Sequence, residues 1–217
     1  TTGNPVAPEC AAGDLLVLTF GGSTLLGGVA PKTPPGWTLI ATDDSSMLML
    51  RRWIKQATDA DSEATVVLEG VGSGPMFGAA VICVYRNAYG VEQTGTNGFT
   101  GGGGATTMTA STVTTVRANQ LIDEAWMWVE GSDGGSSTVE ASTVPSTQRV
   151  NRDYDGSSLV PGLLICTQPQ TVPGTTPARV AELSDAGYWL SATISIYPND
   201  PPNAPTLATP ADGSTVN

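Results

Sequence analysis

No stretch of twelve or more residues in this chain repeats apolar residues at helical spacing without an intervening glycine or proline. Helices fill roughly a third of an average globular protein, so their absence constrains the fold more than any single motif does. The chain has 26 glycines and 16 prolines, and short apolar runs alternate with turn residues along its length. We therefore expect an all-β protein, and 217 residues suffice for one large domain or two small ones.

Residues 76–86 form the most continuous apolar run, and they are rich in β-branched and aromatic residues. A run that is apolar on both faces predicts a central strand covered on two sides. Residues 187–197 have a similar character, and Tyr85 and Tyr197 occupy matching places in the two runs. The chain therefore has two candidate halves, each closed by such a strand.

Further segments of the two halves correspond in the same order. The corresponding pairs are residues 13–20 and 119–129, 35–40 and 145–150, 47–53 and 159–167, 64–68 and 178–182, and 76–86 and 187–197. Their near-constant spacing favours a duplication whose halves complete one core. We expect a jelly-roll β-sandwich over residues 1–198, with pseudo-repeats at about 10–100 and 105–198. Two separate five-stranded domains are the alternative.

The formal net charge is −11, and only 13% of the residues are charged. An acidic chain is repelled by phosphate groups, so nucleic acid and an anionic membrane are disfavoured as partners. The sequence contains no apolar run long enough to cross a membrane as a helix. We expect no nucleic-acid partner and no membrane insertion.

The chain has no histidine, which excludes a Ser-His-Asp triad, a histidine base and the usual zinc sites. Its three cysteines do not form a disulfide framework. Cys83 and Cys166 lie within apolar strands and are expected to be small buried residues. Cys10 lies in a proline-containing segment, where it is either free or paired. No cofactor is expected.

Three carboxylates stand at alternate positions in Asp59, Asp61 and Glu63. On one face of a strand they would resemble the acid pair of a retaining glycosidase, whose carboxyl groups lie about 5 Å apart. Such a strand needs apolar residues between the acids, whereas Ala60 and Ser62 belong to a polar stretch. We therefore favour a solvated turn and expect no catalytic residue.

A partial calcium-loop pattern places oxygen ligands at Asn151, Asp153 and Asp155, followed by Gly156. The bidentate acid of such a loop belongs at the twelfth position, where this chain has Gly162. We therefore expect an exposed hairpin loop and no metal site.

Two pairs of neighbouring charged residues interrupt the strands. Asp123 and Glu124 should point to opposite faces, one toward water and the other toward an arginine across the sheet. Arg51 and Arg52 place one guanidinium on each face of their strand, which predicts a position at the edge of a sheet.

Aromatic residues mark core contacts and one candidate glycan surface. Trp37 follows a Pro-Pro-Gly turn and is expected to anchor the core, while Trp126 and Trp128 share one face of a strand. Trp189 and Tyr197 are predicted to share a face with hydroxyl side chains between them. Those residues are Ser191, Thr193 and Ser195. Core or subunit contact is the favoured interpretation, and glycan binding at the second set stays open.

Four short stretches follow one another in an order found in a known module. They are Gly13-Asp14-Leu15-Leu16-Val17, Pro34-Pro35-Gly36-Trp37-Thr38-Leu39, Trp53-Ile54-Lys55-Gln56-Ala57 and Ala80-Val81-Ile82-Cys83-Val84-Tyr85-Arg86. Together they resemble a β-sandwich module of tailed-bacteriophage virion proteins, which include tail fibres, minor tail proteins and capsid-decorating fibres. Asn87 stands where that module usually has glycine. Residues 199–217 comprise a proline-rich linker and a stretch similar to the first strand of an immunoglobulin-like or fibronectin type III repeat.

The resemblance implies a non-enzymatic structural component of a virion, located in the tail or a surface fibre. It implies other virion proteins and copies of the chain itself as partners, for instance in a trimer, and a host cell-surface glycan as a candidate ligand. No coiled-coil heptad in the sequence specifies a trimer. The alternative function is a carbohydrate-binding module of a secreted bacterial surface protein or glycosidase.

Overall fold

The computed structural model describes residues 4–24, 27–99, 104–130, 139–142, 147–152 and 161–199. Strands make up nearly all of the regular structure in these ranges, and a short 3-10 helix spans Asp59–Asp61. The expected all-β fold class is confirmed. Within the described ranges no helix has the length and apolarity needed to span a membrane.

The first sheet contains four antiparallel strands in the order β2-β3-β1-β4. Their bounds are Leu15–Ser23 for β1, Thr38–Asp44 for β2, Leu48–Gln56 for β3 and Phe77–Tyr85 for β4. Every residue of β1 is buried, because β1 is paired on both edges and covered on both faces. β1 is therefore the central strand of this sheet.

The second sheet is larger, with the order β10-β11-β8-β13-β5. Its strands are β5 (Ala88–Phe99), β8 (Gln120–Glu130), β10 (Thr147–Arg152), β11 (Gly162–Gln170) and β13 (Val180–Pro198). Strands β6 (Ala105–Thr109) and β9 (Val139–Ser142) pair with the first part of β13. Strands β7 (Thr114–Thr115) and β12 (Gly174–Thr175) form a separate pair.

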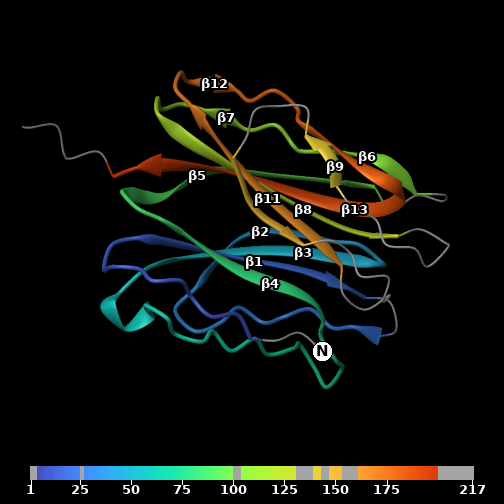
Figure 1. Cartoon of the computed structure of the whole chain (residues 1–217). Helices are drawn as coiled ribbons and strands as arrows, with labels where there is room; N and C mark the ends of the chain where they lie inside the picture. Colours follow the sequence, from blue (N-terminus) through green and yellow to red (C-terminus); the bar gives the residue numbers. More distant parts are fainter. Residues whose placement is uncertain are drawn as a thin grey trace, which may run out of the picture.

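Figure 1 shows the two sheets stacked on each other, with further chain segments on both outer sides. The outer face of the first sheet packs against Ala7, Cys10 and Leu68, which lie outside its strands. The outer face of the second sheet packs against Met108 and Ala110. Both sheets therefore have two covered faces, which explains why so few strands show a simple alternation of apolar and polar residues.

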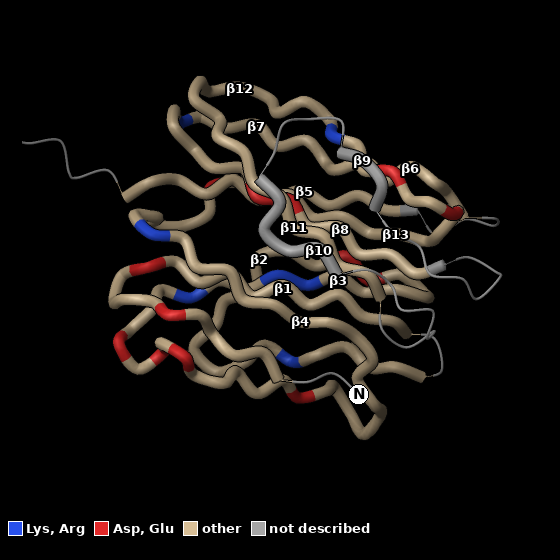
Figure 2. Tube along the Cα trace, viewed as in Figure 1, with Lys and Arg blue, Asp and Glu red and all other residues tan. Residues whose placement is uncertain are grey.

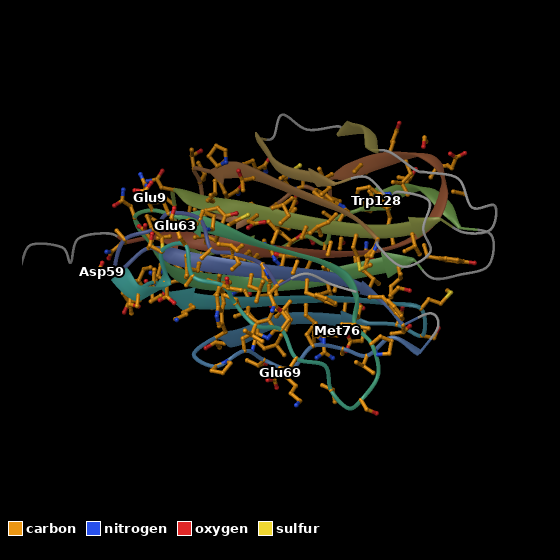
Figure 3. The ribbon with its side chains drawn as sticks, turned by 60° about the horizontal axis from the view of Figure 1, so that its bottom comes forward. Glu9, Asp59, Glu63, Glu69, Met76 and Trp128 are labelled. Carbon is orange, nitrogen blue, oxygen red and sulfur yellow. The ribbon has the colours of Figure 1, made fainter. Side chains whose placement is uncertain are left out.

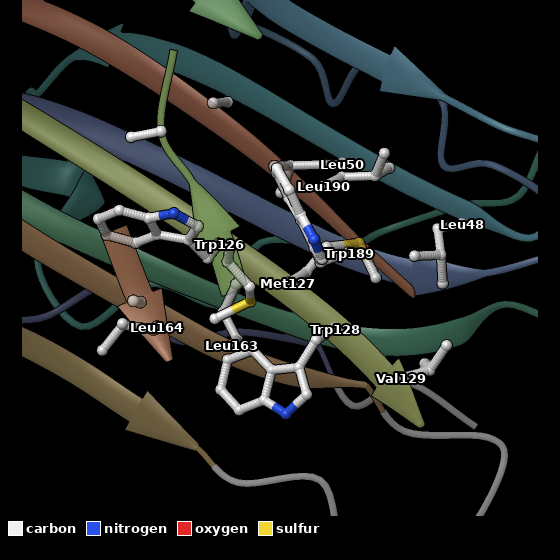
Figure 4. Packing of buried hydrophobic residues seen from close by; sticks show 14 of the residues in the cluster. Leu48, Leu50, Trp126, Met127, Trp128, Val129, Leu163, Leu164, Trp189 and Leu190 are labelled. Atoms are coloured by element: carbon white, nitrogen blue, oxygen red, sulfur yellow. The ribbon is translucent and has the colours of Figure 1, made fainter. Parts of the chain in front are cut away.

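The core between the sheets contains large apolar side chains from both of them (Figure 4). Leu48 and Leu50 of β3 belong to the same buried cluster as Met127 of β8 and Leu190 of β13. The sheets approach closely at Gly21, where an added Cβ would lie 3.0 Å from Met127 Cβ. Shape complementarity of this kind makes substitutions at Gly21 costly.

The first sheet is formed by strands within residues 15–85, while the second sheet takes β5 from the first half of the chain and its other strands from the second half. The described chain passes from the first sheet to the second at Arg86 and Asn87, and Asn87 has a left-handed φ of 56°. The orders β2-β3-β1-β4 and β10-β11-β8-β13 put four of the five corresponding pairs of segments at equivalent places, and residues 64–68 lie outside the strands. The jelly-roll repeat itself is not confirmed, because jelly-roll strands alternate between the sheets and here they do not. The pseudo-repeat stays a prediction.

The expectation that residues 76–86 form the central strand of a sheet is wrong. β4 lies at the edge of the first sheet and pairs with β1 alone among the described strands. Its sequence resembles that of a central strand because its two faces contact the second sheet and the outer cover. The pattern of apolar side chains indicates which faces of a strand are covered, but it does not indicate whether the strand's backbone is hydrogen-bonded to a neighbour along both edges.

The expected burial of Trp37 is confirmed, and side chains fix the turns before β2 and β1. Trp37 is buried in the cluster of the first sheet's outer face, directly after the turn that contains Gly36 at φ 78°. The Asp14 carboxylate accepts a hydrogen bond of 3.0 Å from the backbone N–H of Ala11 and thereby closes the turn before β1.

Candidate functional site

A buried ionic group lies between the two sheets. Arg52 Nη2 of β3 lies 2.8 Å from Asp123 Oδ2 of β8, and both side chains are fully buried. The Tyr85 hydroxyl donates a 2.5 Å hydrogen bond to the same carboxylate oxygen. Arg52 also donates to Thr19 Oγ1 and to the backbone oxygens of Asp123 and Ala192. This group, called the inner pair below, joins both sheets through charge-assisted hydrogen bonds.

A second buried ion pair lies on the opposite face of the second sheet. Arg179 Nη1 donates a 2.6 Å hydrogen bond to Glu124 Oε2, and both side chains are excluded from solvent. With its amide oxygen turned toward Arg179, Gln168 accepts from the same guanidinium. Glu124 Oε1 is buried without a hydrogen-bond partner. Burial raises the pKa of Glu124 to about 7, although the positive charge of Arg179 opposes that shift. We call this the outer pair.

These contacts correct two expectations. Asp123 and Glu124 do point to opposite faces, but neither faces water, because a covering layer lies over each side of the second sheet. The predicted edge position of Arg51 and Arg52 is also wrong, since β3 lies between β2 and β1. Figure 2 shows basic positions between the labels of β1 and β3, in the middle of the molecule.

The acidic stretch forms a capped turn. Asp59 and Asp61 lie in the 3-10 helix, so these carboxylates do not share the face of a strand. Asp61 accepts hydrogen bonds from the backbone and hydroxyl of Thr58 and contacts Lys55 Nζ at 2.5 Å. Burial alone would raise the pKa of Asp61, but the hydrogen bonds from Lys55 and Thr58 lower it. This arrangement stabilises the turn after β3.

The structure does not describe the candidate calcium ligands. Asp153 and Asp155 lie outside the described residues, as does the side chain of Asn151. Within the described ranges, no cluster of three or more acidic or cysteine side chains has the arrangement of a metal site. The expectation that this loop binds no calcium therefore stays a prediction.

The hydroxyl side chains of β13 are buried. Ser191 donates to the backbone oxygens of Asn97 and Thr109, and Thr193 donates to the backbone oxygen of Ser111. Ser195 accepts from the backbone N–H of Gln93. Ser191 and Thr193 thus attach the end of β6 and the segment after it to β13, and the buried hydroxyls close this face of β13 to a glycan. Trp126 and Trp128 are likewise buried in the core.

None of the three cysteines forms a disulfide. Cys166 is buried as expected, and Cys83 is half-buried on the edge strand β4. Cys10 is also buried, and burial together with the charge of Asp61 raises the pKa of its thiol. A thiol with a raised pKa is a poor nucleophile at neutral pH.

The candidate binding site is a groove at the end of the sandwich. Its volume is about 690 Å³, and it lies along the C-terminal part of β4, at the corner where the chain crosses to β5. Pro8 and Glu9 form one wall, while Leu121 of β8 and Ile196 of β13 form the other. We call this cavity the β4 groove. Its size is within the range of pockets that bind ligands in proteins.

Two tyrosines lie next to the β4 groove. The rings of Tyr89 and Tyr197 are 5.5 Å apart and tilted by 39°, and Tyr89 is 62% exposed. The guanidinium of Arg117 lies 4.4 Å from the centre of the Tyr197 ring and forms an ion pair with Glu92. Tyr197 itself lines the groove. The sequence indicated an aromatic surface around Tyr197 but did not reveal Tyr89, which the pairing of β5 with β13 brings there, or Arg117, which lies between β7 and β8.

The end of the molecule near the groove carries acidic side chains. Figure 3 shows Glu9, Asp59 and Glu63 at the same end, away from Glu69. Asp59 accepts a hydrogen bond from the backbone of Ala12. Within the described ranges Glu9 and Glu63 are in no salt bridge. Arg86, which lines the groove together with Glu9, carries the opposite charge, so both signs of charge border the groove.

No family model matches the chain. No curated protein and no solved structure matches it either. The functional argument therefore depends on the residues themselves.

Proposed function

We propose that this chain is a non-enzymatic structural component of a tailed-phage virion, in a tail fibre, a tail tip or a minor tail protein, and that it contributes to host attachment. The proposal rests on the positions of the four stretches that resemble the phage module. Leu15 and Val17 of the first motif pair directly with Gln56 and Ile54 of the third. The same two residues pair on their other side with Tyr85 and Cys83 of the fourth motif.

The second motif belongs to the same region, because Thr38 pairs with Ile54 and Leu39 with Trp53. Four stretches that are separate in the sequence thus form one contiguous part of the first sheet. They supply the central strand of this sheet, its buried tryptophans Trp37 and Trp53, and the corner at which the chain passes to the second sheet. Residues with these positions support a rigid scaffold, on which loops and edges are free to make contacts.

The buried ionic groups are consistent with this role. Each buried carboxylate of β8 has an arginine partner, and these pairs connect the sheets and the outer layers. A protein fixed in this way keeps its shape, which a part of a virion requires. The proposed location is the tail or a surface fibre, with other virion proteins and copies of the chain as neighbours.

Mass spectrometry of purified phage particles tests the proposal, combined with immunogold electron microscopy of the same particles. We expect peptides of this chain in the particles and label on the tail or the surface fibres. A parent protein with a secretion signal and a catalytic domain, absent from every particle, would contradict the proposal.

A carbohydrate-binding module is the second candidate, and the exposed tyrosine pair favours it. Tyr89 offers an open ring face next to Tyr197 and Arg117, a combination suited to stacking on a sugar. A glycan array measured with the purified chain and with Tyr89→Ala tests this function. Saturable binding to a defined glycan that the variant loses would support it, and an empty array would exclude it for the glycans tested.

A further inference from the structure

The step from Asn97 to Gly98 is the single Asn-Gly sequence in the chain. Both residues are exposed and belong to β5, which ends at Phe99 directly after them. Glycine leaves its backbone nitrogen open to approach, because it has no side chain that would shield the nitrogen or restrict the backbone. The pair is therefore a candidate for a reaction between the asparagine side chain and the backbone.

Packing explains why glycine stands at position 98. A Cβ added there would lie 2.5 Å from Leu190 Cδ2 and 3.1 Å from the backbone oxygen of Trp189, both in β13. It would also lie 3.6 Å from Asp43 Oδ2 of β2. These contacts leave little room for a side chain at this point of β5. The fold itself therefore favours a glycine directly after Asn97.

The side chain of Asn97 lies against the backbone nitrogen of Gly98. The N–H of Gly98 donates a 2.9 Å hydrogen bond to Asn97 Oδ1. Asn97 Nδ2 donates a 3.1 Å hydrogen bond to the backbone oxygen of Thr109, and this second bond holds the amide group in place. The carbon Cγ joins the two hydrogen-bonded atoms, so it lies next to the nitrogen that can attack it.

The end of β5 allows the change of backbone conformation that such an attack requires. Ring closure needs Asn97 to leave its extended conformation. The ladder between β5 and β13 ends at the pair of Phe99 and Trp189, two residues beyond Asn97. Backbone pairs near the end of a ladder open more readily than those in the middle of a sheet. Asn97 thus lies where the strand can open while the core stays folded.

We propose that Asn97 is a site of spontaneous deamidation, which converts it to aspartate or isoaspartate and adds a negative charge to β5. The Gly98 nitrogen loses its proton to a base in solution and attacks Cγ of Asn97. A bond from this nitrogen to Cγ forms, the bond from Cγ to Nδ2 breaks, and the leaving nitrogen takes up a proton to become ammonia. Water then opens the resulting succinimide ring. Addition of water at Cγ gives aspartate, and addition at the backbone carbonyl gives isoaspartate.

The product weakens the attachment of β5 to its neighbours. An ionised carboxylate accepts hydrogen bonds and donates none, so the bond from position 97 to Thr109 is lost and two oxygen atoms face each other. Isoaspartate also inserts a carbon atom into the backbone, which moves Gly98 out of its close fit beside Leu190. Deamidation therefore loosens the end of β5 irreversibly. The inference goes beyond the proposed function, because the reaction involves only the chain and water.

Mass spectrometry of the full chain, incubated in mildly alkaline buffer, tests the proposal. A synthetic peptide of residues 94–100 gives the rate of the same step without the fold. We expect aspartate and isoaspartate at position 97, at a rate within about tenfold of the rate in the peptide, because local opening adds a small barrier. Fragmentation by electron transfer distinguishes the two products. Asn87 and Asn119 are exposed but precede alanine and glutamine, so they should stay unchanged over the same period.

Three variants connect the reaction with its structural effect. Asn97→Gln keeps an amide but lengthens the side chain, so ring closure is disfavoured and the mass change at this position should disappear. Asn97→Asp reproduces one product, and we expect faster amide exchange in residues 95–99 and 105–109. Gln93→Glu is the matched control, because it adds the same charge at another exposed position of β5 and should leave that exchange unchanged.

Three outcomes would contradict the proposal. An unmodified Asn97 in the folded chain, under conditions that convert the peptide, would show that β5 protects this step. Equal conversion of Asn87 and Asn119 would remove the role assigned to Gly98. Amide exchange in Asn97→Asp that matches the parent chain would show that the product does not loosen β5. The first two outcomes are read from the parent chain, so they hold even if a variant does not fold.

Discussion

Asp123 and Glu124 are neighbours in β8, yet their carboxylates lie in different environments. Asp123 faces the first sheet, where Arg52 and Tyr85 contact it and Arg52 is held by three further oxygen acceptors. Glu124 faces the outer cover, where Arg179 is its direct partner and one carboxylate oxygen is unsatisfied. Asp123 also has one oxygen without a hydrogen-bond partner. The two acids therefore differ in the other oxygen, which Arg52 and Tyr85 both contact in Asp123 and Arg179 alone contacts in Glu124.

The difference shows that burial and hydrogen bonding act separately on a carboxylate inside the protein. Burial costs a carboxylate its hydration, and only nearby donors and positive charges can replace it. The pKa of Glu124 rises to about 7 because burial outweighs the attraction of Arg179. We therefore expect the inner pair to fix the relative position of the sheets, and the outer pair to respond to pH.

Breaking the inner pair should have the largest effect. Arg52→Ala leaves Asp123 buried without its cation, and we expect a loss of about 3–5 kcal/mol in the free energy of unfolding. Urea denaturation followed by tryptophan fluorescence measures it. The double variant Arg52→Met with Asp123→Leu removes both charges and should recover most of this loss. A single variant as stable as the parent chain would show that the pair contributes nothing.

The outer pair should make stability depend on pH near neutrality. The pKa of Glu124 in the folded chain is about 7, above the value of about 4.3 of an unfolded glutamate. The folded state then binds more protons between these values, so stability falls as pH rises from about 4.5 to about 7. Melting temperatures at pH 5 and pH 8 measure the effect, which we expect to be on the order of 1–3 kcal/mol.

Glu124→Gln is the control for that measurement, because it keeps the size of the side chain and removes the titrating group. The part of the pH dependence that belongs to Glu124 should disappear in this variant. An unchanged slope in Glu124→Gln would assign the pH dependence to other groups and place the pKa of Glu124 nearer its ordinary value.

Removing one hydroxyl from the inner pair should have a moderate effect. Tyr85→Phe deletes the hydrogen bond to Asp123 and keeps the ring in its buried position. We expect a loss of about 1–2 kcal/mol, since Arg52 still neutralises the carboxylate. Chemical denaturation at pH 7 gives the value. A loss as large as that of Arg52→Ala would mean that the hydroxyl and the guanidinium act as one unit.

The smallest effect is expected at the more exposed ion pair of Lys55 and Asp61, which serves as a reference for both buried pairs. Asp61→Ala removes the capping contacts with Thr58, and we expect a loss of about 1 kcal/mol. High salt should reduce the contribution of this pair while leaving the inner pair nearly unaffected. Thermal unfolding at low and high ionic strength compares them, and an equal salt response would contradict the assigned burial.

The sequence was informative about side-chain environment and less so about backbone pairing. It predicted the all-β class, the buried Trp37 and the shared face of Trp126 and Trp128, because apolar periodicity depends on which faces are covered. It misplaced residues 76–86 at the centre of a sheet and Arg51 with Arg52 at an edge. Neither assignment was accessible, since edge pairing and the partner of Arg52 come from segments far away in the sequence.

The candidate site was still harder to predict. The β4 groove is formed by Pro8, Leu121 and Ile196 together with the end of β4, and no local pattern connects these positions. Tyr89 and Tyr197 are more than a hundred residues apart and meet only through the pairing of β5 with β13. Sequence motifs identified the scaffold, whereas the surfaces between its parts required the three-dimensional arrangement.

The position of β13 has a mechanical consequence. This strand ends at Pro198, and residues 187–196 pair with β8 on one side while most of them also pair with β5 on the other. Tension applied to residue 199 along the strand would load both ladders in shear, so many backbone hydrogen bonds would share the force at once. Peeling an edge strand breaks such bonds one after another at much lower force. Whatever is attached after Pro198 is therefore anchored at a place suited to bearing load.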